Sequence, residues 1–249
     1  MTRIMPRDTK FITIVRHPSS QFESMYSYYG FFNKFHTSVE GFARDPKKYY
    51  SREEPAPRHS ALNPVLYDLG LNKKSLSSSK EIDKKIRDVD RSFSLVLVAE
   101  HLYESLVLLK DIMCWSWDDV TFFTSNKRSN SVVRSLPVKT TKQLLEWQSG
   151  DYKLYLHFNR TLHAKIKKYG VKRMEADVEY LKSRNEALAK MCLAGTKKVS
   201  EMHGRTIIDR YVLKPGKKKD FTCKRMTYSA YEYLTILLQK QKLIRKKNL

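Results

Sequence analysis

The sequence predicts an α/β fold in which helices flank a parallel sheet, and three observations carry this prediction. Two short runs of β-branched and other apolar residues, 11–15 and 93–98, have the length and composition of buried strands. Segments with helical spacing follow them, at 21–29 and 103–114. Because the order of strand and then helix occurs twice, a sheet with right-handed crossovers is expected.

The first strand leads directly into a turn and a helix. Arg16 and His17 follow the apolar run 11–15, and Pro18 stands beside two serines. Proline near a first helical turn, with serines next to it, is typical of the start of a helix. The segment therefore predicts a strand, a tight turn and a helix N-terminus in immediate succession.

Residues 31–80 contain several prolines and the serine cluster 75–79, so we expect loops and short helices that cover the core and an active site. A charged amphipathic helix at 80–91 precedes the second strand. Beyond it, helices are predicted at 140–148, 152–169, 171–192 and 229–246, with Gly150 and Gly170 as separators. The basic stretch 195–222 has no clear periodicity and is predicted to be an exposed loop.

Composition favours a globular protein with an anionic ligand. The chain has 249 residues, 41% hydrophobic content and 48 Lys and Arg against 26 Asp and Glu, a net charge of +22. Such a field attracts nucleic acid, an acidic membrane surface, an anionic glycan or a nucleotide with several phosphates. Charge alone does not choose among them, and a basic surface without a ligand is the alternative.

Three cysteines without CxxC spacing argue against a disulfide scaffold and a zinc site, so no metal is expected. In an oxidising compartment Cys192 and Cys223 are the preferred pair, because Cys114 lies in the apolar run 106–117. Three reduced, buried thiols are the alternative. No stretch reaches the roughly 18 apolar residues of a membrane span, and the first residues do not form a signal peptide.

Arg16 and Ser24 are the candidate ligand-binding residues. A guanidinium at the end of a strand, beside the unpaired N–H groups of a helix N-terminus, suits a phosphate monoester. Ser24 lies almost two helical turns further, where its hydroxyl reaches the same anion if the helix crosses the strand end. The alternative is a surface arginine and an ordinary helix serine.

The same residues carry a resemblance. Arg16, with proline two residues later and serine eight residues later, resembles the 3′-phosphate-binding segment of sulfotransferases that use 3′-phosphoadenosine 5′-phosphosulfate (PAPS). Within that superfamily, residues 11–29 are similar to the galactose 3-O-sulfotransferases. Further similar segments follow in the family's order, at 63–70, 93–109, 117–120 and 154–161, and more weakly at 191–192 and 228–242.

The resemblance implies a P-loop-nucleotide-kinase-like sulfotransferase fold and sulfate transfer from PAPS, the co-substrate, to the 3-hydroxyl of galactose in a glycolipid such as galactosylceramide or in a glycan. Arg16 and Ser24 would hold the donor's 3′-phosphate. The basic turn Asn126, Lys127 and Arg128 would reach the donor or the acceptor sugar, with a solvated turn as the alternative. The implied partners are a galactose-terminated acceptor and a membrane surface, and the implied location is the lumenal side of the Golgi membrane.

The chain also departs from the family pattern. The family has a lysine-containing loop for the 5′-phosphosulfate, a catalytic base and a membrane anchor upstream of the matched segment. We therefore expect an N-terminally incomplete single domain over 1–249, with a sheet-containing donor-site part at about 1–125 and a mainly helical part at about 126–249. Little turnover is expected, and the catalytic base is left unassigned. Five histidines are conceivable bases, with a structural or surface role as the more common alternative for each: His17, His36, His59, His101 and His157.

Asn159-Arg160-Thr161 matches the N-glycosylation pattern, which has meaning only in a lumenal protein. Two other function classes stay open beside the enzyme. One is a non-catalytic relative or fragment that binds nucleotide or glycan only. The other is a basic nucleic-acid-binding module, but the sequence has no recognised motif for it, so no nucleic-acid partner is expected.

Overall fold

The computed structural model describes residues 5–6, 8–50, 61–123, 135–200 and 207–247. The chain divides into two compact units. Unit 1 contains Met1–Val120 and Arg134–Glu179, and unit 2 contains Thr121–Val133 and Tyr180–Leu249. The structure is mixed α/β, mostly helical with a small parallel sheet, which confirms the predicted class at this level.

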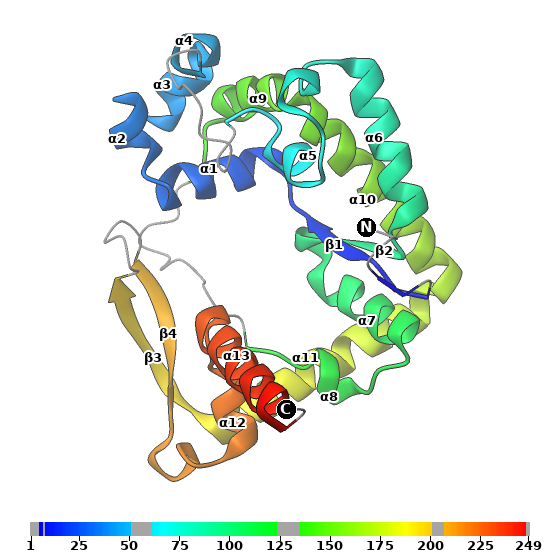
Figure 1. Ribbon diagram of the computed structural model, residues 1–249, viewed down its shortest axis with the longest axis vertical. Helices are drawn as coiled ribbons and strands as arrows, with labels where there is room; N and C mark the ends of the chain where they lie inside the picture. Colours follow the sequence, from blue (N-terminus) through cyan, green and yellow to red (C-terminus); the bar gives the residue numbers. More distant parts are fainter. Residues whose placement is uncertain (1–4, 7, 51–60, 124–134, 201–206, 248–249) are drawn as a thin grey trace. The chain divides into compact units, whose positions relative to one another are not determined.

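The parallel sheet of unit 1 is formed by β1 (Ile12–Val15) and β2 (Leu95–Val98) (Figure 1). Val15 lies opposite Val98 in this pairing. All four residues of β2 are buried, and helices α7 (Leu102–Met113) and α10 (Ser149–Tyr169) both contact it. In β1, however, Ile12 and Ile14 are 41% and 50% exposed. The prediction of a buried first strand was therefore wrong for one face of β1, because among the described residues the sheet has two strands and that face lacks a cover.

Short helices follow the first strand, as predicted. They are α1 (Pro18–Tyr28), α2 (Phe31–Phe35), α3 (Val39–Arg44), α4 (Pro46–Tyr50) and α5 (Pro64–Asp68). Their apolar sides form an aromatic core around Phe22 and Phe42, which are 1% and 0% exposed. Gly30, with φ of 62°, makes the left-handed turn that sends α2 back onto α1.

Helices α6 (Ser79–Ser92) and α9 (Val138–Trp147) complete this side of unit 1, with the 3₁₀ turn η1 (Lys73–Ser75) before α6. Gly150 was expected to separate two helices, but it lies inside the first turn of α10, and α9 ends at the residue before Gln148. Gly150 is needed for a close approach, because a Cβ there would lie 2.8 Å from the Asn63 amide nitrogen.

A buried polar network ties α5 to the start of α10. Both carboxylate oxygens of Asp151 accept backbone N–H groups, from Val65 and Leu66, at 2.9 Å each. The side chain of Asn63 accepts the Asp151 N–H and donates to the Leu76 carbonyl. Because these partners satisfy the otherwise orphaned first N–H groups of α5, five residues suffice to form that helix.

The second strand leads through the 3₁₀ turn η2 (Ala99–His101) into α7, and α8 (Trp117–Val120) follows. Gly170, with φ of 102°, ends α10 before α11 (Val171–Cys192), as the sequence predicted. The helices at 138–169 belong to the same unit as the sheet. The predicted change of architecture near residue 125 therefore does not coincide with the division into units.

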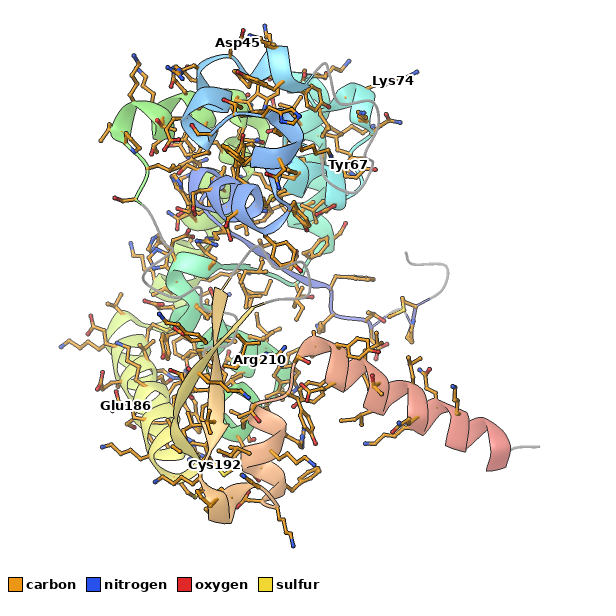
Figure 2. All side chains as sticks on the ribbon, turned by 90° about the vertical axis from the view of Figure 1, so that its left-hand side faces the viewer. Asp45, Tyr67, Lys74, Glu186, Cys192 and Arg210 are labelled. Carbon is orange, nitrogen blue, oxygen red and sulfur yellow. A yellow bond between two sulfur atoms is a disulfide. The ribbon has the colours of Figure 1, made fainter. Side chains whose placement is uncertain are left out.

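Unit 2 contains an antiparallel hairpin of β3 (Leu193–Ser200) and β4 (Ile207–Leu213), followed by η3 (Pro215–Lys217), α12 (Phe221–Met226) and α13 (Ala230–Lys247). The predicted exposed loop at 195–222 was wrong. The described side chains of β3 after Leu193 are largely exposed, so the strand lacks the apolar alternation that marks a half-buried strand. Figure 2 labels Arg210 on this hairpin and Cys192 at its base.

A disulfide joins Cys192 to Cys223, with their Cα atoms 5.4 Å apart. Both cysteines are fully buried beside Phe123. Cys114, the remaining cysteine, is exposed, at the left-handed C-cap of α7. The pair chosen from the sequence is thus the bonded pair, but the alternative of three buried thiols was wrong and so was the buried surrounding inferred for Cys114.

Candidate functional site

The candidate site lies at the carboxyl edge of the parallel sheet. Because β1 and β2 are parallel and in register, Arg16 and Glu100 leave the sheet at the same edge. Open α/β sheets bind ligands at this edge, where the loops to the following helices begin. Helix α1 also starts there, directly after β1.

The N-terminus of α1 lacks a side-chain cap among the described residues. His17 is the N-cap, Pro18 has no N–H group, and the backbone of Gln21 already bonds to the His17 carbonyl at 3.0 Å. The N–H groups of Ser19 and Ser20, in the first turn, have no preceding helical turn to which they could bond. Together with the positive end of the helix dipole, they favour an anion at this point.

Arg16 is exposed, and its guanidinium has no hydrogen bond or ion pair with any residue that the structure describes. Ser24 lies on α1, six residues after Pro18, which is roughly 9 Å along the helix axis. Its side chain is half-buried and has no hydrogen bond within the described part of the chain. Both predicted residues thus lie on the segment that begins at the carboxyl edge. The guanidinium of one and the hydroxyl of the other can donate hydrogen bonds to a ligand.

Glu100 connects two elements at this edge. Its Oε1 accepts the backbone N–H of His17 at 2.9 Å, which joins η2 to the start of α1. Tyr155, on α10, lies near this carboxylate: burial raises the pKa of Tyr155, and the negative charge of Glu100 raises that pKa further.

The His17 ring is held on two sides. Its Nδ1 lies 2.9 Å from the Ser19 hydroxyl, and its ring meets Tyr155 edge-on with centroids 5.2 Å apart. At the end of β2, the buried Ser105 hydroxyl accepts the Val98 N–H at 3.1 Å, which secures the backbone just before Glu100. Hydrogen bonds and ring contacts therefore join the segments at the carboxyl edge to one another.

The family model described as Galactose-3-O-sulfotransferase matches residues 1–241. The chain belongs to this family. Among curated relatives, it is 32% identical to galactose-3-O-sulfotransferase 2 of Sus scrofa, over 96% of the chain and 64% of the relative. It is 33% identical to galactosylceramide sulfotransferase of Bos taurus, over 90% of the chain and 57% of the relative. No solved structure matches the chain.

The family membership confirms the resemblance seen in the sequence, and a galactose-3-O-sulfotransferase implies a sulfate donor. The chain spans about half to two thirds of the length of the curated relatives that it matches.

Sequence reasoning missed Glu100 and Tyr155 as members of this edge. In the sequence, both are only members of segments similar to the family, Glu100 of 93–109 and Tyr155 of 154–161. No local pattern relates them to Arg16, because they come from parts of the chain 84 and 139 residues further on. Only the parallel pairing of β1 with β2 and the position of α10 bring these side chains together.

The other predicted residues have varied positions. Asn126, Lys127, Arg128 and His59 lie outside the described residues. His36 is an exposed C-cap of α2, while His101 meets His163 with ring centroids 4.9 Å apart. His157 Nε2 lies 3.4 Å from an Asp90 oxygen, on the side of α10 that faces α6.

Asn159 lies in the middle of α10, and its Oδ1 is buried without a hydrogen-bond partner among the described residues. The Thr161 hydroxyl of the same triplet donates to the His157 carbonyl. A glycan on Asn159 would therefore have to leave from a half-buried helix position, and glycosylation there stays a prediction. Within the described residues, no three His, Cys, Asp or Glu side chains are grouped as metal ligands.

Proposed function

We propose that the chain forms the 3′-phosphate-binding part of a galactose 3-O-sulfotransferase that transfers a sulfuryl group from PAPS to the 3-hydroxyl of galactose. One observation carries this proposal: an arginine without a partner among the described residues stands beside an uncapped helix N-terminus, at the carboxyl edge of a parallel sheet. Family membership supplies the chemistry for which such an anion site is suited.

Arg16 and Ser24 bind the 3′-phosphate in this proposal. The planar guanidinium donates two parallel hydrogen bonds to phosphate oxygens, and the first-turn N–H groups of α1 donate along the helix axis. The Ser24 hydroxyl donates from the second turn. This set recognises the group that distinguishes PAPS from ordinary adenine nucleotides. Asn126, Lys127 and Arg128 contribute further donors to the nucleotide or to the acceptor sugar.

The fold that we propose is the P-loop-nucleotide-kinase-like sulfotransferase fold. Its supports are the parallel strands in register and the helices α7 and α10 packed on β2. In folds of this class the nucleotide lies across the carboxyl ends of the strands, which is where Arg16 lies.

In the reaction, the galactose 3-oxygen attacks sulfur, the bond from sulfur to the 5′-phosphate oxygen breaks, and adenosine 3′,5′-bisphosphate leaves. The acceptor hydroxyl loses its proton to a base, which we leave unassigned in this chain. In this reaction the 3′-phosphate-binding residues hold the end of the donor that is remote from sulfur, so that the sulfuryl group has one position. These residues are Arg16, Ser24 and the first turn of α1.

The acceptor that we propose is galactose in a glycolipid, as the relative named galactosylceramide sulfotransferase favours, or in a glycan. A membrane surface is the second partner. Unit 2 has 20 Lys and Arg against five Asp and Glu, a net charge of +15. On α13, Tyr231, Leu234 and Leu237 are more than half exposed, and lysines follow them. Exposed apolar side chains next to basic ones suit the interface of an anionic bilayer.

The lumenal side of the Golgi membrane is the location that we propose. A disulfide between Cys192 and Cys223 is the observation in its favour, because such bonds persist in oxidising compartments. None of the helices in the described part of the chain combines the length and hydropathy that a bilayer crossing requires.

Calorimetric titration with adenosine 3′,5′-bisphosphate tests the donor site. Wild-type chain is expected to bind it, and Arg16→Ala to bind at least about tenfold more weakly, since a hydrogen bond to a charged group is worth about 1.5–3 kcal/mol. Titrations at two salt concentrations separate the specific contact from the diffuse basic field. Equal binding by Arg16→Ala and wild type would contradict the donor site.

Transfer is tested with sulfur-labelled PAPS and two acceptors, galactosylceramide in vesicles and a soluble galactoside. Labelled product with either acceptor supports the enzyme, and a preference for the vesicles supports the glycolipid and the membrane surface. Nucleotide binding without any labelled product would instead favour the non-catalytic relative that binds nucleotide only.

A further inference from the structure

We propose that a hollow at the start of α10 binds a sugar residue of the acceptor, apart from the site at Arg16. The hollow has a volume of about 280 Å³ and lies in unit 1, where α5, α6 and α10 begin and α9 ends. Small-molecule sites measure roughly 300–1,000 Å³, so a hollow near the lower end of this range suits one sugar ring rather than a nucleotide. This inference rests on the proposed function, because the acceptor proposed there is a galactose-containing glycolipid or glycan.

The floor of the hollow is largely apolar. Leu76 and Ile82 line it and are 0% and 5% exposed. Trp147 lines it as well, and its ring is held in place because Nε1 donates to the Ala61 carbonyl at 2.6 Å. Aliphatic and aromatic side chains make up most of the lining of small-molecule sites, and here they suit the apolar C–H face of a sugar ring.

Hydrogen bonds hold this floor in shape. The Asn63 side chain, which lines the hollow, donates to the Leu76 carbonyl at 2.8 Å and accepts the Asp151 N–H at 2.9 Å. The Gln148 side chain accepts the Asn63 N–H and donates to the Ala61 carbonyl. Because these groups bond to one another, the hollow is preformed, as small-molecule sites usually are.

The rim of the hollow has polar groups without a hydrogen-bond partner among the described residues. They are the hydroxyls of Ser77, Ser79 and Ser149, and all three side chains are exposed. A serine hydroxyl can donate one hydrogen bond and accept others, and so can each hydroxyl of a sugar. The rim therefore matches a ligand with several hydroxyl groups.

The charge of the hollow favours a neutral ligand over an anion. Among the described residues that line it, Lys153 is the only charged one, and its Nζ pairs with Asp83 Oδ1 at 2.5 Å. A phosphate or sulfate would compete with this carboxylate for the ammonium group. A sugar hydroxyl can accept from the same ammonium group without breaking the pair, because the group has three N–H donors.

The first two turns of α10 connect the hollow to the carboxyl edge of the sheet. Tyr152 meets the His17 ring with centroids 6.0 Å apart, and the next residue, Lys153, lines the hollow. The same short stretch of helix thus contacts the turn after Arg16 and forms part of the hollow. This position is consistent with a subsite for the acceptor beside the site proposed for the donor.

The test follows the fluorescence of Trp147 during a titration with lactose, a soluble galactoside. Trp115→Phe and Trp117→Phe make Trp147 the sole tryptophan of the chain, and this double variant is the parent for all others. Lactose is expected to bind the parent and to change its emission. Ser149→Ala removes one hydrogen-bonding group and is expected to weaken binding by about twofold to tenfold. Ser149→Leu places a bulky apolar side chain at the hollow and is expected to abolish binding.

The matched control is Ser92→Ala, because Ser92 is an exposed serine at the other end of α6 and does not line the hollow. This variant is expected to bind lactose like the parent. Sodium sulfate is the control ligand, and it is expected neither to change the emission nor to displace lactose. Urea unfolding, followed by the same fluorescence, verifies that each variant is folded.

The outcomes separate this inference from the proposed function. If lactose leaves the emission of the parent unchanged, or binds equally well to Ser149→Leu, the sugar site is overturned. It is overturned as well if sulfate displaces lactose, since the hollow is then an anion site. In each of these cases the donor site still stands if wild type binds adenosine 3′,5′-bisphosphate and Arg16→Ala does not. If lactose binds as expected but Arg16→Ala binds the bisphosphate like wild type, the sugar site stands and the proposed function fails.

Discussion

The two units of the chain are stabilised in different ways. Unit 1 has a large aromatic core, in which Phe42 lies 5.2 Å from Phe22 and 5.1 Å from Phe35 between ring centroids. Unit 2 has a small buried cluster, in which the two bonded cysteines are fully buried beside Phe123. Small units bury too little apolar surface for a stable core, and a disulfide offsets this by restricting the unfolded chain.

The net charge also differs between the two units. Of the net +22, unit 2 contributes +15 with one third of the residues, whereas the larger unit 1 contributes +7. Self-repulsion in unit 2 opposes its compact state. The unit that carries the proposed donor site is therefore held by packing, whereas the basic unit is also held by a covalent bond.

The largest expected effect is on the packing of unit 1. Phe42→Ala removes a fully buried ring and is expected to lower the free energy of unfolding by about 3–5 kcal/mol. All three tryptophans, at 115, 117 and 147, lie in unit 1, so urea unfolding followed by tryptophan fluorescence reports on this unit. Phe32→Ala is the control, because Phe32 is 61% exposed and its loss is expected to change stability by less than about 0.5 kcal/mol. Equal effects of the two substitutions would contradict the aromatic core.

The next effect concerns the disulfide of unit 2. Cys223→Ser opens a bridge between residues 31 apart and is expected to destabilise unit 2 by about 3–4 kcal/mol. Hydrogen exchange of the β3–β4 hairpin is expected to accelerate, while the tryptophan transition of unit 1 keeps its midpoint. Cys114→Ser serves as the control, since that thiol is exposed and unbonded. A hairpin that exchanges equally slowly in both variants would mean that packing alone holds unit 2.

The smallest of the three effects is a pH dependence from the polar network of unit 1. Burial raises the pKa of Asp151 to about 7, although the N–H bonds from Val65 and Leu66 lower it, whereas the ordinary value is 3.8. Between these two values the folded chain binds more protons than the unfolded chain, so stability falls as pH rises and levels off above pH 7. Relative to Asp151→Asn, the wild-type free energy of unfolding is expected to fall by about 3 kcal/mol from pH 5 to pH 8.

Urea unfolding at several pH values, followed by tryptophan fluorescence, measures this difference. Asp151→Asn is itself expected to be less stable than wild type at pH 5, because its amide N–H₂ faces a backbone donor. The gap between the two proteins should therefore narrow with rising pH. Parallel stability profiles of the two proteins would show that Asp151 titrates alike in the folded and unfolded chain.

Local patterns were sufficient for much of the fold. The apolar run 11–15, followed by Arg16 and Pro18, predicted the strand, the turn and the start of α1, because each of these depends on neighbouring residues. The long helices α10 and α11 followed from periodicity and from Gly170. Hydrophobic periodicity did not predict β3, because most of its side chains are exposed and the strand is held by backbone hydrogen bonds to β4.

By itself the sequence determined the family, the order of the main elements in unit 1 and the two residues proposed to bind a phosphate, since all of these depend on residues close together in the chain. Only the tertiary structure decided that Glu100 and Tyr155 meet the residue after Arg16, and that Asp151 caps α5 from 85 residues away. The physical reason is that strand pairing and helix packing bring distant side chains together. A local pattern records the period of one element and not the partner against which that element is placed.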